Sequence, residues 1–462
     1  MSTVHLPVIK DDSVRGSILA DGHRKKIVPA DVQGRFATAR KIVIYALIAF
    51  AGVLPWIHVG HAPAVFIDVD HRKFFLFGAT LNAQDTWLLF FALSGVGFSL
   101  VYVTALLGRA WCGWACPQTV LLEGVYRRVE RLLEGPRVKH MKRDAGASSF
   151  GRSIRKIAKH ALFVFVSIAI AHGILAYFVS VPAVFRMVRH SPAEHPEAFA
   201  WVFAISAALY GNFAFFREQL CVVLCPYGRL QSVLLDDDSL VVGYDRSRGE
   251  PRGKKGTKNA GDCVDCERCV VVCPTGIDIR EGLQMDCIAC TTCIDACDDV
   301  MTRLGRDTGL IRYDSPRGLS GEKRRIVRPR VVLYTALLAA GAIAATIALR
   351  ARTDFEANVV RLPGAPFTID DGTVRNGFQI HVVNKLGRRS GFDVTIDSPK
   401  KSSTVLAVSH VELDPLAQEN VVFFVTAPRD VPLGGDLVHV TVVRSDAKDD
   451  ALAQTVRLLG VK

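Results

Sequence analysis

The chain has 462 residues, of which 50% are hydrophobic and 22% charged. This length exceeds one ordinary domain, and the composition favours a membrane protein. The formal net charge of +12 would suit a nucleic-acid partner, but the basic residues gather in the connections between apolar segments. That distribution indicates membrane topology, so no nucleic-acid partner is expected.

Residues 1–38 are polar, include Arg24, Lys25 and Lys26, and contain no apolar run long enough for a signal-peptide core. They predict a mobile cytoplasmic arm. Each apolar segment that follows is close to the ~20 residues that an α-helix needs to cross a bilayer, and basic residues flank the segments. The sequence therefore predicts five transmembrane helices, at about residues 41–59, 86–107, 161–181, 199–216 and 331–349.

The connections between these segments differ in charge. Residues 108–160 carry 12 Lys or Arg against 4 Asp or Glu, whereas the connections at 60–85 and 182–198 are short and less basic. The positive-inside rule then places the amino terminus, residues 108–160 and residues 217–330 in the cytoplasm, and the carboxyl-terminal part outside. Every cysteine would lie at or beyond the cytoplasmic face, where thiols stay reduced.

Two short cysteine boxes occupy the predicted cytoplasmic ends of the second and fourth spans. Both have the spacing Cys-x-x-x-Cys-Pro, in Trp111–Pro117 and Leu220–Pro226, which indicates one helical hairpin used twice. Four thiolates brought together would form a soft site that prefers Cu(I), zinc or an iron–sulfur cluster to hard cations. The alternative is that small cysteines simply pack between helices. The residues concerned are Cys112, Cys116, Cys221 and Cys225.

Two basic stretches accompany this region. Arg127, Arg128 and Arg131 alternate with apolar residues at helical spacing, which predicts a helix lying along the membrane surface. Lys323, Arg324, Arg325, Arg328 and Arg330 precede the last span. We expect this second stretch to hold that end of the helix inside, and docking of an acidic electron donor is the alternative.

The remaining eight cysteines form two boxes of the ferredoxin type, each Cys-x-x-Cys-x-x-Cys-x-x-x-Cys, after a polar stretch at 236–260 that predicts a linker. In two-cluster ferredoxins the fourth cysteine of each box ligates the other cluster. Zinc sites are the alternative, but they favour paired rather than tripled cysteines. The spacing therefore predicts two [4Fe-4S] clusters, one held by Cys263, Cys266, Cys269 and Cys297, the other by Cys287, Cys290, Cys293 and Cys273.

From about residue 360 the pattern changes to short alternating runs separated by turn residues, at 377–383, 387–396, 421–425 and 437–443. Strands at such intervals over about 100 residues predict a β-sandwich of immunoglobulin type. This part has no cysteine and no catalytic constellation, so we expect it to contact a partner.

The predicted fold is thus a mixed membrane protein with five transmembrane α-helices, a cytoplasmic ferredoxin-like domain for two [4Fe-4S] clusters and a C-terminal immunoglobulin-like β-sandwich. Its expected parts are a cytoplasmic arm (1–38), a four-helix membrane region with both Cys-x-x-x-Cys-Pro boxes (39–235), the ferredoxin-like domain (236–325), a fifth transmembrane helix (326–352) and a periplasmic immunoglobulin-like domain (353–462).

The sequence resembles the cytochrome c oxidase accessory proteins called CcoG, FixG or RdxA. The residues that carry the resemblance are 111–118 (WCGWACPQ), 217–231 (REQLCVVLCPYGRLQ), 244–253 (YDRSRGEPRG), 273–284 (CPTGIDIREGLQ), 293–301 (CIDACDDVM) and 309–313 (GLIRY). Related membrane ferredoxins of nitrate and nitrous-oxide respiration also use Cys-x-x-x-Cys-Pro boxes.

The resemblance implies a bacterial inner-membrane protein that serves assembly of the cbb(3)-type oxidase by reducing Cu(II) to Cu(I). We expect copper to be held near Cys112, Cys116, Cys221 and Cys225 and passed to a copper chaperone or copper-exporting ATPase. The electron donor is unknown, and a homodimer is one expected assembly.

Two other functions are open at this point. In one, the chain is a membrane ferredoxin that passes electrons between a quinol pool or a cytoplasmic donor and a partner, with a third cluster on the four membrane cysteines. In the other, it is an iron–sulfur redox sensor or scaffold whose partner binding changes when the clusters are oxidised.

Overall fold

The computed structural model describes residues 14–15, 18–19, 27–60, 62–70, 72–81, 85–145, 150–254, 256–370, 372–399, 401–430 and 435–460. The basic residues Arg24 to Lys26 of the predicted arm lie outside the described residues. The chain divides into two compact units, one of Met1–Ile57, Pro63–His71 and Leu89–Ile343, the other of His58–Ala62, Arg72–Leu88 and Ala344–Lys462.

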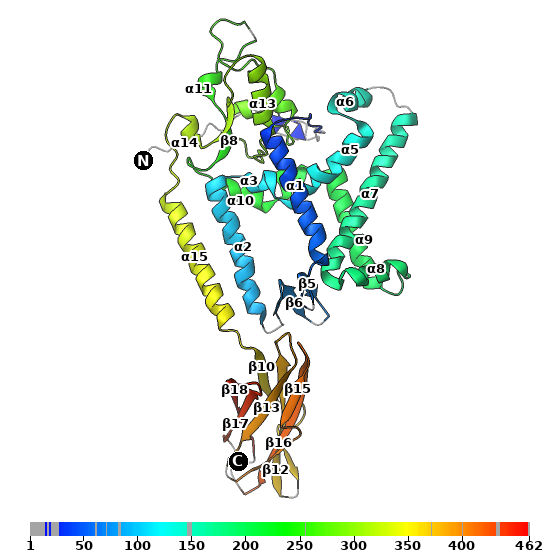
Figure 1. The fold of residues 1–462 in the computed structure, drawn as a ribbon, viewed down its shortest axis with the longest axis vertical. Helices are drawn as coiled ribbons and strands as arrows, with labels where there is room; N and C mark the ends of the chain where they lie inside the picture. Colours follow the sequence, from blue (N-terminus) through cyan, green and yellow to red (C-terminus); the bar gives the residue numbers. More distant parts are fainter. Residues whose placement is uncertain are drawn as a thin grey trace. The chain divides into compact units, whose positions relative to one another are not determined.

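Five helices of the described chain are long and apolar enough to cross a membrane, as the sequence predicts (Figure 1). These segments are Arg35–Trp56, Trp87–Leu107, Phe150–Val179, Pro196–Phe216 and Pro329–Arg350. At most 22% of the most apolar window of each is buried inside the protein, so their apolar side chains face outward, as expected of helices solvated by lipid.

The helices and turns of the membrane part are α1 (Arg35–Val53), η1 (Leu54–Trp56), α2 (Thr86–Leu107), α3 (Ala110–Trp114), α4 (Pro117–Leu121), η3 (Leu122–Tyr126), α5 (Arg127–Glu134), α6 (Arg137–Ala145), α7 (Phe150–Val179), α8 (Val181–Arg189), α9 (Pro196–Gly211), η4 (Asn212–Phe216), η5 (Leu220–Leu224), α10 (Pro226–Leu234) and α15 (Pro329–Arg350). Short strands are β1 (Val14–Arg15), β2 (Ile18–Leu19), β3 (His58–Val59), β4 (Ala62–Pro63), β5 (Val65–Asp68), β6 (Lys73–Leu76) and β7 (Ala79–Leu81).

The first helix begins earlier than the sequence pattern predicts, inside the expected arm. The Asp295 carboxylate accepts hydrogen bonds from the backbone N–H groups of Phe36 (3.3 Å) and Ala37 (2.6 Å), so it satisfies donors that a helix N-terminus leaves free. Upstream, the N–H of Ala30 donates to the carbonyl of Val271 at 3.0 Å. The prediction of a mobile arm is therefore wrong for residues 27–38, because these contacts fix them to the ferredoxin-like part.

The predicted surface helix after the first cysteine box exists as the continuous helical run α4–η3–α5, but Arg127 does not face water. Only 3% of Arg127 is exposed, and its guanidinium pairs with Glu123 and, at 3.4 Å, with Glu218. Arg127 is turned inward by its pairs with Glu218, which is 3% exposed, and with Glu123.

The ferredoxin-like part, called the cluster domain below and taken as residues 236–325, contains β8 (Val241–Tyr244), α11 (Arg246–Gly249), α12 (Arg268–Val271), η6 (Ile279–Glu281), α13 (Thr292–Arg303), β9 (Ile311–Asp314) and α14 (Pro316–Leu319). Strand β8 pairs antiparallel with β9, from Val241 opposite Asp314 to Tyr244 opposite Ile311. The prediction that 236–260 is only a linker is wrong, because this stretch supplies a buried strand that closes the domain.

The second unit contains a two-layered β-sandwich, as predicted. One sheet has the strand order β10-β12-β16-β14, with β11 also paired to β12, and the other has β15-β13-β17-β18. Phe355, Phe378, Phe392 and Phe423 fill the interior between inner-facing valines. The strands are β10 (Phe355–Arg361), β11 (Thr368–Asp370), β12 (Thr373–Asn384), β13 (Ser390–Asp397), β14 (Ser403–Leu406), β15 (His410–Leu413), β16 (Gln418–Pro428), β17 (Leu437–Arg444) and β18 (Ala447–Arg457).

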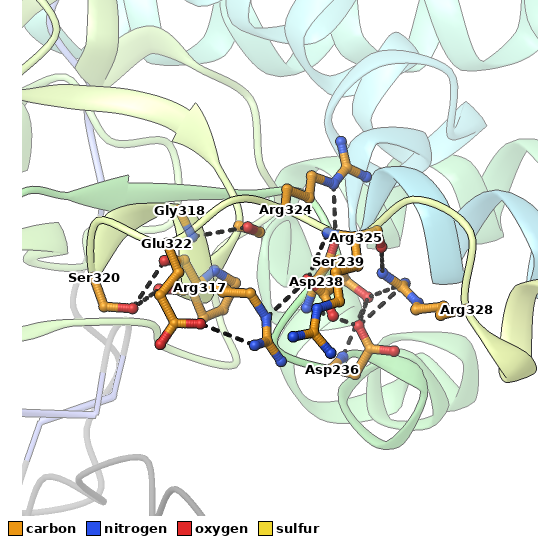
Figure 2. Close-up of polar contacts among 12 residues, drawn as sticks. Asp236, Asp238, Ser239, Arg317, Gly318, Ser320, Glu322, Arg324, Arg325 and Arg328 are labelled. Atoms are coloured by element: carbon orange, nitrogen blue, oxygen red, sulfur yellow. Dashed lines mark hydrogen bonds and ion pairs between the residues drawn. The ribbon is translucent and has the colours of Figure 1, made fainter.

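The basic stretch before α15 packs against Asp236, Asp238 and Ser239 (Figure 2). It also contacts the end of α2. Arg324 donates to the carbonyl of Leu106 and Arg328 to that of Ala105, both at 2.5 Å, while Ser239 also donates to Ala105 at 2.9 Å. These donors satisfy carbonyls that a helix C-terminus leaves free, and the cations suit its negative dipole end. Arg324 and Arg328 are therefore engaged inside the protein rather than presented to a partner.

Candidate iron–sulfur and membrane cysteine sites

The first predicted ligand set is brought together in the cluster domain. Cys263, Cys266, Cys269 and Cys297 line one cavity. Cys297 reaches it from α13, one helical turn after the second triplet, and the three cysteines of the first box lie close enough to act on its charge. The fourth cysteine of the second box, Cys297, thus lies with the first three cysteines of the first box, in agreement with the predicted exchange.

The second set lines a neighbouring cavity. Cys273, Cys287, Cys290 and Cys293 all border it, and Cys269 borders both cavities. Burial raises the pKa of Cys287 and of Cys297 to about 12. As free thiols these groups would keep their protons at neutral pH, and a soft metal group supplies the positive charge that lets such thiols ionise.

The spread of the thiols bears on the alternative of structural zinc. Within the described ranges, no three His, Cys, Asp or Glu side chains are close enough to hold one metal ion. Cysteines that ligate different irons of a cube need not converge on one point, whereas the four ligands of a zinc ion must. The donor set and its spacing therefore fit clusters better than zinc, although ligation by these eight residues stays a prediction.

The two Cys-x-x-x-Cys-Pro boxes fold alike. In both, the second cysteine is extended and precedes a helix whose first residue is proline, Pro117 of α4 and Pro226 of α10. The N–H of Cys116 donates to the carbonyl of Trp111 at 2.9 Å, and that of Cys225 to Leu220 at 2.8 Å. The same five-residue hydrogen bond thus closes both boxes, as a duplicated hairpin predicts.

The two boxes also lie next to each other. The charges of Cys116 and Cys225 act on both remaining thiols of the group. Burial, reinforced by these neighbours, raises the pKa of Cys112 to about 11 and that of Cys221 to about 12. The structure therefore brings all four membrane cysteines into one sulfur-rich group, in which Cys112 and Cys221 keep their protons at neutral pH when nothing is bound.

Arg109 connects this sulfur group to the cluster domain. Its guanidinium donates to the Gln231 side-chain oxygen (3.0 Å), to the carbonyl of Gly228 (2.7 Å) and to the carbonyl of Cys287 (3.1 Å). The Cys112 thiol donates to the same Gln231 oxygen at 3.2 Å. One buried cation thus bridges both boxes and a predicted ligand of the second cluster.

Gln231 offers a further donor at this place. It is fully buried, and its amide nitrogen has no hydrogen-bond partner within the described chain. A buried, unpaired N–H is costly unless something accepts from it. A bound thiolate or an inorganic sulfide would accept such a bond, so the orphaned donor fits a metal group held by the membrane cysteines.

The first box packs directly on the loop of the second cluster. A Cβ atom at Gly113 would stand 2.5 Å from the carbonyl oxygen of Ile288, so only glycine allows this approach. Tyr313 receives a hydrogen bond from Trp114 at 3.2 Å and donates to the carbonyl of Ala289 at 2.8 Å. The sequence gives no sign of these contacts of Gly113, Arg109 and Gln231, because the chain segments that they join are distant in sequence; Gly113 and Gln231 enter the sequence analysis only as parts of longer motifs.

A second buried bridge supports the turn after Cys273. Arg127 donates to the carbonyl of Pro274 at 3.1 Å and pairs with Glu218, while Arg217 pairs with Glu130 at 2.7 Å. Pro274 follows a predicted ligand, and Glu218 precedes the second membrane box. This ion network therefore fixes the second cluster's turn relative to the helices that carry the membrane cysteines.

Comparison with protein families identifies these parts. Residues 216–316 match the model of a 4Fe-4S dicluster domain and residues 88–136 that of a 4Fe-4S binding domain. Residues 345–460 match the immunoglobulin-like fold at the C-terminal end of FixG. The predicted fold class, with its five spans, iron–sulfur domains and C-terminal sandwich, is confirmed.

Similar whole proteins agree with these matches. Nitrogen fixation protein FixG of Rhizobium meliloti is 36% identical over 81% of this chain and 79% of its own. Proteins RdxA and RdxB of Cereibacter sphaeroides are 35% and 31% identical, each over 81% of this chain and 82% of its own. A crystal structure of a FixG-related protein from Vibrio parahaemolyticus covers 24% of the chain at 14% identity, with a TM-score of 0.21 that is too low to support an argument. The chain belongs to the CcoG/FixG/RdxA family, and it is an iron–sulfur electron-transfer protein of a membrane.

Proposed function

We propose that this protein reduces Cu(II) to Cu(I) for assembly of a cbb(3)-type cytochrome c oxidase. The observation that carries the proposal is the Arg109 bridge, which links the membrane sulfur group to the loop of the second predicted cluster. Each cupric ion gains one electron and no proton, and the electron comes from a cytoplasmic one-electron donor. When bound, the two clusters would supply storage for single electrons.

The residues of the chain have separate tasks in this scheme. Cys112, Cys116, Cys221 and Cys225 bind the copper substrate, and thiolates favour the cuprous product over the cupric ion. Copper binding displaces the thiol protons, so the raised pKa values make uptake weaker in acid. Arg109 and Gln231 hold the boxes beside the cluster domain, and the Cu(I) passes on to a copper chaperone or copper-exporting ATPase.

The proposed sidedness follows the charge of the connections. The 12 basic residues between 108 and 160 favour the cytoplasm for this segment, the cluster domain and the amino terminus. Five spans then put the sandwich in the periplasm of a bacterium, with the helices in the inner membrane. The sandwich would meet the oxidase assembly partners there.

A second candidate has an observation of its own. The 4Fe-4S binding domain matched at 88–136 includes Cys112 and Cys116, which favours a third cluster on the four membrane cysteines. The lack of a converging single-ion site within the described ranges points the same way. The protein would then conduct electrons from a quinol pool or a cytoplasmic donor to a partner.

Metal analysis of anaerobically purified protein separates the two functions. If the membrane thiols bind copper, wild type and a Cys112→Ser/Cys221→Ser variant should both contain about eight irons, as two cubes require, and only the wild type should retain copper. About twelve irons in the wild type, falling to about eight in the variant, would instead establish the third cluster. Wild-type protein without copper or additional iron would refute both.

A further inference from the structure

A polar cavity of about 70 Å³ lies outside both sulfur sites. Its walls come from the segment before α1, the first turns of α1, the run η3–α5 and the cluster domain, where Val272, Pro274 and Thr292 border it. At roughly 10–15 Å³ for each water-sized group, it has room for a phosphate group and too little for a nucleotide.

The charge lining this cavity is positive. Arg40, Lys41, Arg128 and Arg131 border it against two acids, Asp31 and Glu123. Asp31 pairs with Arg131, which also borders the cavity, and Glu123 pairs with Arg127 outside the lining. For Lys41 and Arg128 the described part of the chain offers no ion pair, so an incoming anion would meet cations whose charge is not already balanced.

Two residues that border this cavity each have a buried donor without an acceptor. Arg40 is only 6% exposed, and its Nε donates to the Gly113 carbonyl at 2.8 Å. Its Nη2 atom is buried without a hydrogen-bond partner among the described residues, and so is Nε of Arg128. Because an unpaired buried donor costs about 1–3 kcal/mol, and more when it is charged, the cavity is built for an acceptor with negative charge.

The position of the cavity indicates which kind of anion binds there. Arg40, Lys41, Ile44 and Tyr45 belong to the first turns of a membrane-capable helix, Arg35–Trp56. Lipid phosphates lie at the level of such helix ends, where basic pockets between helices bind anionic headgroups and tyrosine is common. Tyr45 is exposed beside the cavity, so an acyl chain could leave along the apolar face of α1.

We propose that this cavity binds the phosphate of an anionic phospholipid. The bound headgroup accepts from Arg40 and Arg128 and is paired with Lys41. It also touches Val272 and Pro274, which flank Cys273, so the lipid fastens the turn of the second predicted cluster to the membrane surface. This site is independent of whether copper is the substrate.

The test uses the full-length protein with its clusters, in detergent, and follows the thermal unfolding midpoint with added lipid. Phosphatidylglycerol should raise the midpoint of the wild type, because a ligand that binds only the folded state stabilises it. Phosphatidylcholine should not. Lys41→Gln and Arg128→Gln remove cations without disturbing the Arg40 bond to Gly113, and each should reduce the rise, while Lys142→Gln, an exposed control on α6, should keep it.

Each alternative result has a definite meaning. An equal rise with inorganic phosphate at the same concentration would assign the cavity to a free anion and overturn the lipid. An unchanged phosphatidylglycerol effect in both variants would place the lipid elsewhere and overturn the site. No effect of phosphatidylglycerol on the wild type would overturn the proposal altogether.

Discussion

Arg109 donates a hydrogen bond to the carbonyl oxygen of Cys287 at 3.1 Å, and so joins the end of the second span to a predicted cluster ligand 178 residues away. The same guanidinium holds Gln231 and Gly228 of the helix that follows the second membrane box. The proposed electron exchange between the two sulfur sites needs a fixed separation, and the Arg109 side chain spans it.

The first prediction concerns that bridge. Arg109→Lys keeps the charge but cannot direct three donors in the geometry of a planar guanidinium. We expect unchanged iron content, because Arg109 is not a ligand, together with roughly tenfold slower copper reduction, the equivalent of ~1.4 kcal/mol in the barrier. The measurement is copper reduction by pre-reduced protein, with Lys142→Gln as the control, and a rate equal to wild type would remove Arg109 from the pathway.

The second prediction concerns the close approach at Gly113. Gly113→Ala places a methyl group 2.5 Å from the Ile288 carbonyl, and the resulting shift should destabilise the protein by about 1–3 kcal/mol. Gly95→Ala in α2 is the matched control, because its added methyl group meets no atom within 4 Å. Thermal unfolding in detergent compares them. Equal midpoints would mean that the contact between box and loop is absent in solution.

The third prediction concerns the buried ion network. Arg127→Gln removes the cation that pairs with both Glu123 and Glu218, and leaves Glu218, itself 3% exposed, with the more distant Arg217 at 3.7 Å. The loss should cost about 3–5 kcal/mol. Arg303→Gln breaks the exposed pair with Asp299 and should cost less than about 1 kcal/mol. Denaturant unfolding followed by tryptophan fluorescence distinguishes them, and similar losses would show that Arg127 is not buried against Glu218.

The fourth prediction asks whether the basic stretch before α15 stabilises the protein by capping the end of α2 or only by its net charge. Arg328→Gln removes the donor to the Ala105 carbonyl and should lower stability by about 1–3 kcal/mol, as expected for a buried charged hydrogen bond. Arg325→Gln removes the same charge from an exposed side chain and should have little effect. If both variants lose the same stability, net charge rather than helix capping explains the stretch.

The features of this fold that depend on short stretches of chain can be predicted from the sequence. Cysteine spacing predicts that Cys297 joins the first box and Cys273 the second, as the two cavities show. The spacing suffices because each fourth cysteine lies one turn beyond its own triplet and so points away from it. Apolar length likewise anticipates the spans. Contacts between distant segments leave no such local signal. Strand β8 looks like a linker until β9 pairs with it, and Arg109 looks like one more basic residue of a cytoplasmic loop.

The most direct test of the central claim is a single-turnover experiment. Anaerobic protein with reduced clusters is mixed with Cu(II), and cluster absorbance and Cu(I) formation are followed together. We predict that the wild type forms one Cu(I) for each electron lost, and that Cys112→Ser/Cys221→Ser keeps its cluster absorbance but forms Cu(I) much more slowly. Equally fast Cu(I) formation in that variant would contradict the account, because copper would then be reduced without the membrane cysteines.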